Sequence, residues 1–290
     1  MSFRNILIKS RCKLSYSLNY MIIRKADSEQ KVILDEIKLI MINSLEVSLT
    51  SALVNELSKR KIKIIFCNEK CNPECEIVSY QNNYYSYLKI KEQINFNDAL
   101  KDELWKYVIK EKIMNQAHNL MKNHSDIEAD KLFEFENNVE NADITNREGH
   151  AAKVYFNALF GKDFVRHKAD ETNKYLDYGY SILLSCISRC IKKLGLLTEF
   201  GIHHIGDSNP FNLSCDFIEP LRPMVDSIVK FGDVNDDNFK EVMINILQYK
   251  VLFGGKEYFL DNAIELYVQN LVGFLKTGDF EKIEFIKYEL

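Results

Sequence analysis

The stretch L-K-D-E-L-W-K-Y-V-I-K-E-K-I at residues 100–113 decides the fold class of this chain. Its apolar residues recur every three or four positions, the spacing of one face of an α-helix; they are Leu100, Leu104, Trp105, Val108, Ile109 and Ile113. Helical patterns return at 148–160, 172–194, 213–230, 238–253 and 257–275, with few prolines to interrupt them. We therefore expect residues 98–290 to form a large all-α domain.

The residues before this stretch follow a different pattern. Short runs rich in Ile, Leu, Tyr and Val predict strands at Asn5–Lys9, Lys13–Ser17, Tyr20–Arg24, Val32–Leu34 and Lys38–Ile42. Thr50 is predicted to cap a helix that ends near Arg60, and K-I-I-F-C at 63–67 predicts a buried strand. Residues 1–75 should thus form a small β-rich domain, and the polar, tyrosine-rich residues 76–97 a linker. The predicted fold class is α+β.

The composition of the chain indicates the cellular compartment in which the protein is expected. No apolar run approaches the roughly 20 residues that a membrane span needs, and the N-terminus has no signal-peptide pattern. The seven cysteines are an odd number, which argues against a disulfide framework. Their spacings of four do not match the paired C-x-x-C of structural zinc; these cysteines are Cys67, Cys71, Cys75, Cys186 and Cys190. We expect a soluble, cytoplasmic protein with no membrane association.

The distribution of charge along the chain is uneven. A formal net charge of −4 gives no global sign of nucleic-acid binding. Residues 147–193, however, hold nine Lys or Arg and five Asp or Glu, a net of +4, whereas residues 194–290 hold eight and sixteen, a net of −8. A metal site beside a phosphate-binding surface would produce this division, and so would chance variation on a solvated surface. The sequence leaves both interpretations open.

Three polar residues stand in unusual local contexts. Glu148 lies in T-N-R-E-G-H-A-A-K (145–153), His204 closes G-I-H-H (201–204), and Glu219 lies in L-S-C-D-F-I-E-P-L-R-P (213–223). Two carboxylates and an imidazole can hold a divalent ion of the magnesium or manganese type, which serves phosphodiester chemistry. The three residues together predict such a site.

Each residue also has a structural explanation. Thr145 and Glu148 fit a capping box, in which the Thr side chain caps a helix and the Glu three residues later bonds back to a backbone amide. His204 fits a packed or solvated histidine. Asp216 and Glu219 fit the acidic residues that favour the start of a helix, on one face if the helix begins near residue 214. These alternatives remain open from the residues alone.

These segments resemble the CRISPR-associated integrase family, the catalytic subunit of the spacer-acquisition complex, in its type II-like form. The resemblance covers nearly the whole length. Its motifs are K-I-I-F-C-N-E-K-C-N-P, L-K-D-E-L-W, T-N-R-E-G-H-A-A-K-V-Y-F-N-A-L-F-G, N-K-Y-L-D-Y-G-Y, G-I-H-H and C-D-F-I-E-P-L-R-P. One departure is Cys71, where the family pattern has His. The resemblance implies a β-rich domain that dimerises, followed by a helical catalytic domain.

The resemblance also implies a mechanism and a set of site residues. Glu148, His204 and Glu219 carry over as the catalytic ligands of Mg²⁺ or Mn²⁺, and Asp216 has a supporting role. The 3′-hydroxyl of an incoming DNA fragment would attack a phosphodiester at the end of a CRISPR repeat, with hydrolysis as a side reaction. Phosphate contacts should dominate capture of the DNA. The basic candidates for this role are Arg147, Lys153, Arg166 and Lys168.

The implied partners are double-stranded DNA, a second copy of this chain, and a small CRISPR-associated subunit whose dimer bridges two such dimers into a heterohexamer. Two other functions compete with integration. One is a stand-alone metal-dependent nuclease, which would cleave without joining. The other is a non-catalytic DNA-binding scaffold, in which Glu148 serves only to cap its helix.

Overall fold

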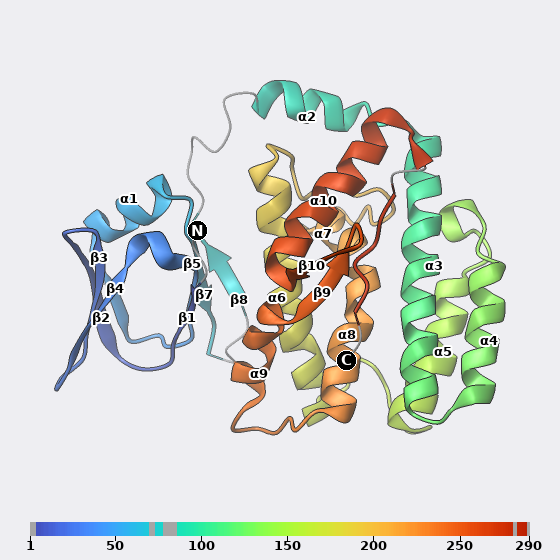
Figure 1. Ribbon diagram of the computed structural model, residues 1–290, viewed down its shortest axis with the longest axis horizontal. Helices are drawn as coiled ribbons and strands as arrows, with labels where there is room; N and C mark the ends of the chain where they lie inside the picture. The colour runs from blue at the N-terminus through green and yellow to red at the C-terminus, as the bar shows by residue number, and fades with distance from the viewer. Residues whose placement is uncertain (1–3, 70–72, 78–85, 281–282, 289–290) are drawn as a thin grey trace. The chain divides into compact units, whose positions relative to one another are not determined.

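The computed structural model describes residues 4–69, 73–77, 86–280 and 283–288 (Figure 1). The chain divides into two compact units, Met1–Tyr84 and Tyr85–Leu290. The first is β-rich and the second is largely helical, as the sequence predicts. Cys71 lies outside the described residues, and the six other cysteines form no disulfide with one another. No helix in the described part of the chain is long and apolar enough to cross a membrane.

The first unit contains two four-stranded sheets. In one, three parallel strands are followed by an antiparallel edge strand, in the order β1 (Arg4–Ile8), β5 (Ile37–Ile42), β7 (Lys63–Cys67) and β8 (Pro73–Glu76). In the other the order is β4 (Glu29–Ile33), β3 (Tyr20–Arg24), β2 (Cys12–Ser17) and β6 (Val47–Leu49), with β2 and β6 parallel. The parallel strand β5 is almost continuously apolar because both of its faces are buried.

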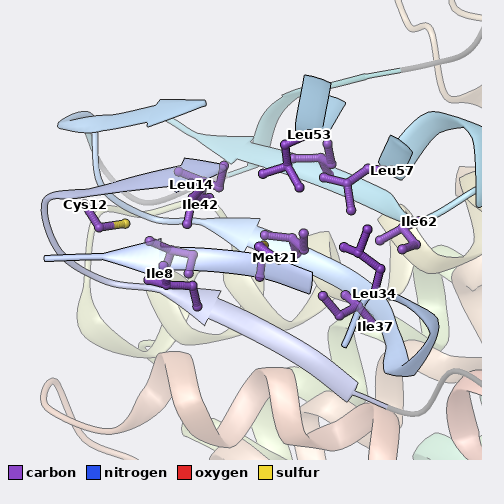
Figure 2. Packing of buried hydrophobic residues seen from close by; sticks show 13 residues of the cluster. Ile8, Cys12, Leu14, Met21, Leu34, Ile37, Ile42, Leu53, Leu57 and Ile62 are labelled. Atoms are coloured by element: carbon purple, nitrogen blue, oxygen red, sulfur yellow. The ribbon is translucent and has the colours of Figure 1, made fainter. Parts of the chain in front are cut away.

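Helix α1 (Ser51–Lys59) closes the core of this unit. The Thr50 side chain accepts a hydrogen bond from the backbone amide of Leu53, which confirms the predicted cap. Figure 2 shows Leu53 and Leu57 of this helix pointing into the same apolar cluster as Leu14 and Met21 of the strands. Residues from both sheets and from α1 therefore form one hydrophobic core.

The second unit is built around α3 (Asp98–Lys122). This helix contacts α4 (Asp126–Asn137), α5 (Arg147–Phe160), α8 (Arg222–Phe231) and α10 (Leu260–Thr277) (Figure 1). The predicted apolar stripe is buried along it, at Leu104, Trp105, Val108, Ile109 and Ile113. Helix α6 (Glu171–Lys193) packs against α7 (Asn212–Ile218), α8, α9 (Phe239–Asn245) and α10, and its Cys186 and Cys190 are buried as expected for small apolar side chains.

The structure differs from the sequence predictions in several places. Within the predicted linker 76–97, Ser86–Ile94 forms helix α2 of the second unit, where buried Gln93 exchanges hydrogen bonds with the backbone of Leu197. Helix α4 had no predicted counterpart. The patterns at 238–253 and 257–275 run into a hairpin of β9 (Lys250–Phe253) and β10 (Lys256–Phe259), so this unit is not entirely α-helical. The Gly254–Gly255 turn joins strands because both glycines have positive φ, as a two-residue hairpin turn requires.

A buried polar network ties four helices of the second unit together. The carboxylate of Asp226 on α8 accepts hydrogen bonds from the hydroxyls of Tyr155 on α5, at 2.9 Å, and Tyr180 on α6. The Tyr155 hydroxyl in turn accepts one from the Asn119 amide on α3, at 2.9 Å. Burial raises the pKa of Asp226 to about 6, although both tyrosine hydrogen bonds act in the opposite direction. The network holds α8 in a fixed position beside α3 and α6.

This pKa predicts a pH-dependent stability. Between about pH 4 and pH 6 the folded chain keeps a proton on Asp226 that the unfolded chain releases, so this contribution to stability falls as pH rises. The shift from 3.8 to about 6 corresponds to about 3 kcal/mol, complete above pH 6. In denaturant titrations followed by the fluorescence of the single tryptophan, Asp226→Asn should gain about 3 kcal/mol relative to the unmodified chain between pH 4 and pH 7.

The exposed Asp207→Asn is the matched control and should show no such change with pH. A constant difference between Asp226→Asn and the unmodified chain over this range would contradict the prediction.

Candidate active site

Glu148 enters the site from the first turn of α5. The helix is capped by Asn146, in the left-handed conformation, whose side chain accepts from the amide of Gly149 at 3.2 Å. Asp143 accepts from the amides of Arg147 and Glu148 at 2.8 and 3.0 Å. The capping-box alternative is therefore wrong. Its glutamate would have to be the third helical residue, and that residue is Gly149. The Glu148 side chain is free to point away from the helix end.

Glu219 enters from the turn between α7 and α8. Pro220 and Pro223 interrupt the helix, and residues Glu219–Leu221 form a single 3₁₀ turn that joins α7 to α8. Glu219 is only 4% exposed. The alternative that acidic residues favour a helix start is wrong for Asp216, because α7 begins at Asn212 and has no acidic residue in its first turn. Glu219, by contrast, does begin the 3₁₀ turn.

The two glutamates meet on one cation that the sequence analysis had not identified. The ammonium Nζ of Lys112, on α3, lies 2.5 Å from Oε1 of Glu148 and 2.5 Å from Oε2 of Glu219. The other oxygen of Glu219 accepts a hydrogen bond from Nε of Arg222 at 2.8 Å. Lys112 and Arg222 thus balance the charges of the two carboxylates.

The charges in this cluster shift one another's pKa values. Burial alone would raise the pKa of Glu219, but Arg222 and Lys112 outweigh it and lower the pKa to about 2. Burial alone would lower the pKa of Lys112, and the attraction of Glu219 and Glu148 holds it above its ordinary value. Glu219 and Lys112 are therefore both charged at neutral pH.

His204 is held by the buried carboxylate of Asp216. Asp216 is fully buried and accepts backbone hydrogen bonds from Ile202 (2.6 Å), His203 (3.2 Å) and His204 (3.0 Å). Its Oδ1 also lies 2.6 Å from Nδ1 of the His204 ring and raises the pKa of that imidazole. Because a carboxylate can only accept, Nδ1 donates to it, and in the neutral ring Nε2 then carries the lone pair. This arrangement is the usual one for an imidazole that ligates a metal.

Trp105 forms the wall of the site next to the histidines. Its ring stacks on His203, with centroids 4.2 Å apart and planes 4° apart, and lies edge-on to His204 at 5.6 Å. His203 is exposed, but its ring is held by this stacking. Trp105 and Lys112 are seven residues apart on α3, so one face of that helix carries both.

The described residues contain no ready-made metal cluster. Among them, no three His, Cys, Asp or Glu side chains lie close enough together to hold a metal ion. The two carboxylates converge on Lys112 instead, and the charges of Glu219 and Glu148 act on His204 at longer range. The structure therefore brings Glu148 and Glu219 together on Lys112, and it orients the His204 ring through Asp216 within range of both carboxylate charges.

The four predicted DNA-binding residues differ in solvent exposure and in whether their charged groups already contact other side chains. Lys153 on α5 and Lys168 in the loop before α6 are exposed. Arg147 is half-buried, with its guanidinium 6.0 Å from the ring centre of Phe135. The guanidinium of Arg166 is already bonded, to Asn173 at 2.5 Å and to Asp177 at 2.6 Å.

Sequence reasoning missed Lys112, Arg222 and the role of Trp105. Lys112 had a signal, because it falls three and four residues after Ile109 and Val108 on the apolar stripe, where a charge requires a buried partner. Arg222 had another, since residues three apart on a helical segment face each other. Neither signal identifies the partner residue; the two partners of Lys112 lie 36 and 107 residues away in the chain.

Comparison with known proteins places these residues in a family. The model of the family "CRISPR associated protein Cas1" matches residues 6–241. The "CRISPR-associated endonuclease Cas1" of Neisseria meningitidis serogroup C (strain 8013) is 35% identical over 230 residues, 79% of this chain and 75% of that protein. A relative of Francisella tularensis subsp. novicida (strain U112), "CRISPR-associated endonuclease Cas1 1", is 26% identical over 285 residues, 87% of this chain and 89% of that protein.

Solved structures share the fold. A casposase bound to an integration product has a TM-score of 0.74 and 19% identity, and the match covers 96% of this chain and 92% of that one. A Cas1 protein from Thermotoga maritima has a TM-score of 0.73 and 17% identity, covering 94% and 97%. A chain of a Cas6-RT-Cas1–Cas2 complex has a TM-score of 0.76 and 17% identity; the match covers 97% of this chain but 36% of that longer one. This chain belongs to the CRISPR-associated Cas1 family.

Proposed function

We propose that this chain is the metal-dependent DNA integrase of CRISPR spacer acquisition. The observation that carries the proposal is the convergence of Glu148 and Glu219 on a single cation, beside an imidazole that a buried carboxylate orients. Membership of the Cas1 family, whose curated relatives are named endonucleases, supports nuclease or integrase chemistry at this site. The likeness to a casposase bound to an integration product supports joining in addition to cleavage.

Glu148, Glu219 and Nε2 of His204 would hold Mg²⁺ or Mn²⁺. The donor set fits, because two carboxylate oxygens and a neutral imidazole suit a hard to intermediate divalent ion. The fit requires that the Lys112 ammonium leave the space between the carboxylates. A bound divalent ion would neutralise the non-bridging oxygens of the attacked phosphodiester and lower the barrier to in-line displacement.

The chain's own residues prepare this chemistry. Asp216 fixes the tautomer and orientation of His204, so that Nε2 is the nitrogen presented to the metal. Arg222 holds one oxygen of Glu219 and leaves the other for the site. In the reaction the 3′-oxygen of the incoming strand forms a bond to the phosphorus at the repeat end and loses its proton. The bond to the former 3′-oxygen of the repeat strand breaks, and that oxygen gains a proton, so no energy-carrying cofactor is consumed.

The proposed assembly contains more than one copy of this chain. Two ends of one DNA fragment require two active sites, hence at least a homodimer. Two structures with a similar fold are Cas6-RT-Cas1–Cas2 complexes, which supports a small CRISPR-associated partner of the Cas2 kind. We propose that a dimer of this partner bridges two dimers of this chain into a heterohexamer. Exposed Lys153 and Lys168 are the basic residues best placed to contact DNA phosphates.

A single assay separates integration from its rivals. It combines the chain, the small partner, a duplex fragment with free 3′-hydroxyls and a supercoiled plasmid that carries the repeat, in Mn²⁺. Joined products support the proposal. Cleavage without joining would identify a stand-alone nuclease, and DNA binding with neither reaction would identify a scaffold.

Glu148→Gln should lose joining by at least about 100-fold, because removal of a metal ligand costs more than the loss of a residue that orients one. The amide keeps the size of the side chain, and Lys112 keeps its bond to Glu219. Thermal unfolding followed by tryptophan fluorescence should therefore remain cooperative. Lys153→Gln serves as a comparison that should weaken DNA binding without abolishing the chemical step. Normal joining by Glu148→Gln would refute the assignment of this glutamate.

Asp216→Asn should weaken Mn²⁺ binding by about 10- to 100-fold, the usual cost of losing the residue that orients a metal-binding histidine. An amide has one acceptor oxygen where Asp216 now accepts four hydrogen bonds, and its NH₂ group would face donors. Titration with Mn²⁺, with the free ion measured by electron paramagnetic resonance, gives the affinity. The exposed Asp207→Asn should bind as the unmodified chain does.

A further inference from the structure

Lys112 bonds to two carboxylates at once, whereas an ordinary structural ion pair needs only one. Its Nζ lies 2.5 Å from one oxygen of each of two carboxylates that come from different helical segments. The residue is 7% exposed, and Glu219 is 4% exposed, so water does little to screen either charge. The ammonium is therefore the cation that Glu148 and Glu219 share, and it offsets the repulsion between them.

The space that Nζ occupies is the space that a shared divalent cation would take. On Glu219 a metal would use Oε2, because Oε1 bonds to Arg222, and Oε2 is the oxygen that now bonds to Lys112. The ammonium and a divalent ion could not share this oxygen at bonding distances, about 2.1 Å for Mg²⁺, without strong repulsion. Lys112 and the metal therefore exclude each other.

Arg222 does not compete in the same way. Its Nε bonds to Oε1 of Glu219, whereas Lys112 bonds to Oε2. Its guanidinium also lies 4.7 Å from the ring centre of Tyr180, which holds it against α6. Of the two cations on Glu219, only Lys112 bridges to Glu148.

The backbone that carries Lys112 is fixed, but its side chain is flexible. One turn further along α3, buried Asn115 donates a hydrogen bond to the carbonyl of Pro220 at 3.0 Å, which anchors α3 to the turn that carries Glu219. Departure of the ammonium thus requires rotation of the four-carbon side chain and no movement of the helix.

We propose that Lys112 is the resident counter-ion of the active site: its ammonium holds Glu148 and Glu219 together in the metal-free protein and is displaced when a divalent cation binds, so that Lys112 sets the metal affinity. This inference rests on the proposed function, because it takes the two glutamates to be metal ligands. Lys112 is a positioning residue in the metal-free state and a competitor of the metal.

The test is a Mn²⁺ titration of three proteins, with the free ion measured by electron paramagnetic resonance. Lys112→Met keeps the length of the side chain and removes the charge, and it should bind Mn²⁺ about tenfold more tightly than the unmodified chain, as expected for coupled groups in contact. Lys110→Met, two residues away, removes a different ion pair, with Glu136 at 3.0 Å, and should leave the affinity unchanged. Equal or weaker binding by Lys112→Met would overturn the inference.

Thermal unfolding gives a second measurement on the same proteins. Without metal, Lys112→Met should melt below the unmodified chain, because two carboxylates lose their shared cation. Saturating Mn²⁺ should raise its Tm by more than it raises that of the unmodified chain. A smaller or equal rise would contradict displacement.

Lysine acylation of the unmodified chain provides a test that does not depend on the variant's folding. Lys112 should react slowly with an acylating reagent in the metal-free protein and faster in saturating Mn²⁺, as read by mass spectrometry, with Lys110 as internal reference. An unchanged rate would overturn the inference even if Lys112→Met does not fold. Absence of Mn²⁺ binding by the unmodified chain would instead refute the metal assignment on which the inference rests.

Discussion

The burial of one carboxylate, that of Glu219, is the constraint on which the site depends. An isolated charge in the interior is very costly, so a buried carboxylate needs cations within bonding distance. Glu219 has two, Arg222 from its own helical segment and Lys112 from α3. The requirement for the second cation fixes the approach of α3 to the 3₁₀ turn, and Lys112 in turn requires Glu148. The two ion pairs of Lys112 thus join segments that lie 36 and 107 residues apart in the chain.

A second buried carboxylate shapes the other half of the site. Asp216 accepts three backbone N–H groups and one ring N–H, all from residues 202–204. It therefore fixes a loop that has no secondary structure of its own and gives His204 a defined orientation. Asp216 and Glu219 are three residues apart, on either side of the end of α7. One short segment thus organises both the histidine and the glutamate pair.

Much of this could be predicted from the sequence, for reasons that are local. Most of the predicted strands of the first unit, the Thr50 cap and the apolar stripe of α3 follow from periodicity and capping, and the structure confirms them. The predictions failed where local preference is weak or overridden. Helix α2 lies in a polar stretch with no clear period and is held by the tertiary contacts of Gln93. The β9–β10 hairpin lies in apolar segments that fit a helix equally well until the positive φ of two glycines is known.

In the site, too, the sequence indicates individual residues from local motifs but not their partners from distant parts of the chain. Glu148, His204 and Glu219 were found from their motifs, but the residue that joins two of them, Lys112, was recognisable only as a charge on an apolar stripe. Spacing predicts which face a residue occupies, whereas the partner on that face depends on how the helices pack. The local alternative for Glu148 failed by a single position, because Asn146 begins the helix one residue later than Thr145 would.

A metal site built from carboxylates faces two opposed requirements. With the metal bound, the ligands should carry uncompensated negative charge, since that charge holds the cation. Without the metal, the same charge repels itself inside the protein and destabilises the fold. In the proposed site Lys112 would satisfy the second requirement and weaken the first, because a metal ion shared by the two glutamates would have to displace it. Stability without the metal and affinity for the metal would then be linked through one side chain, as expected where function and stability compete for the same residues.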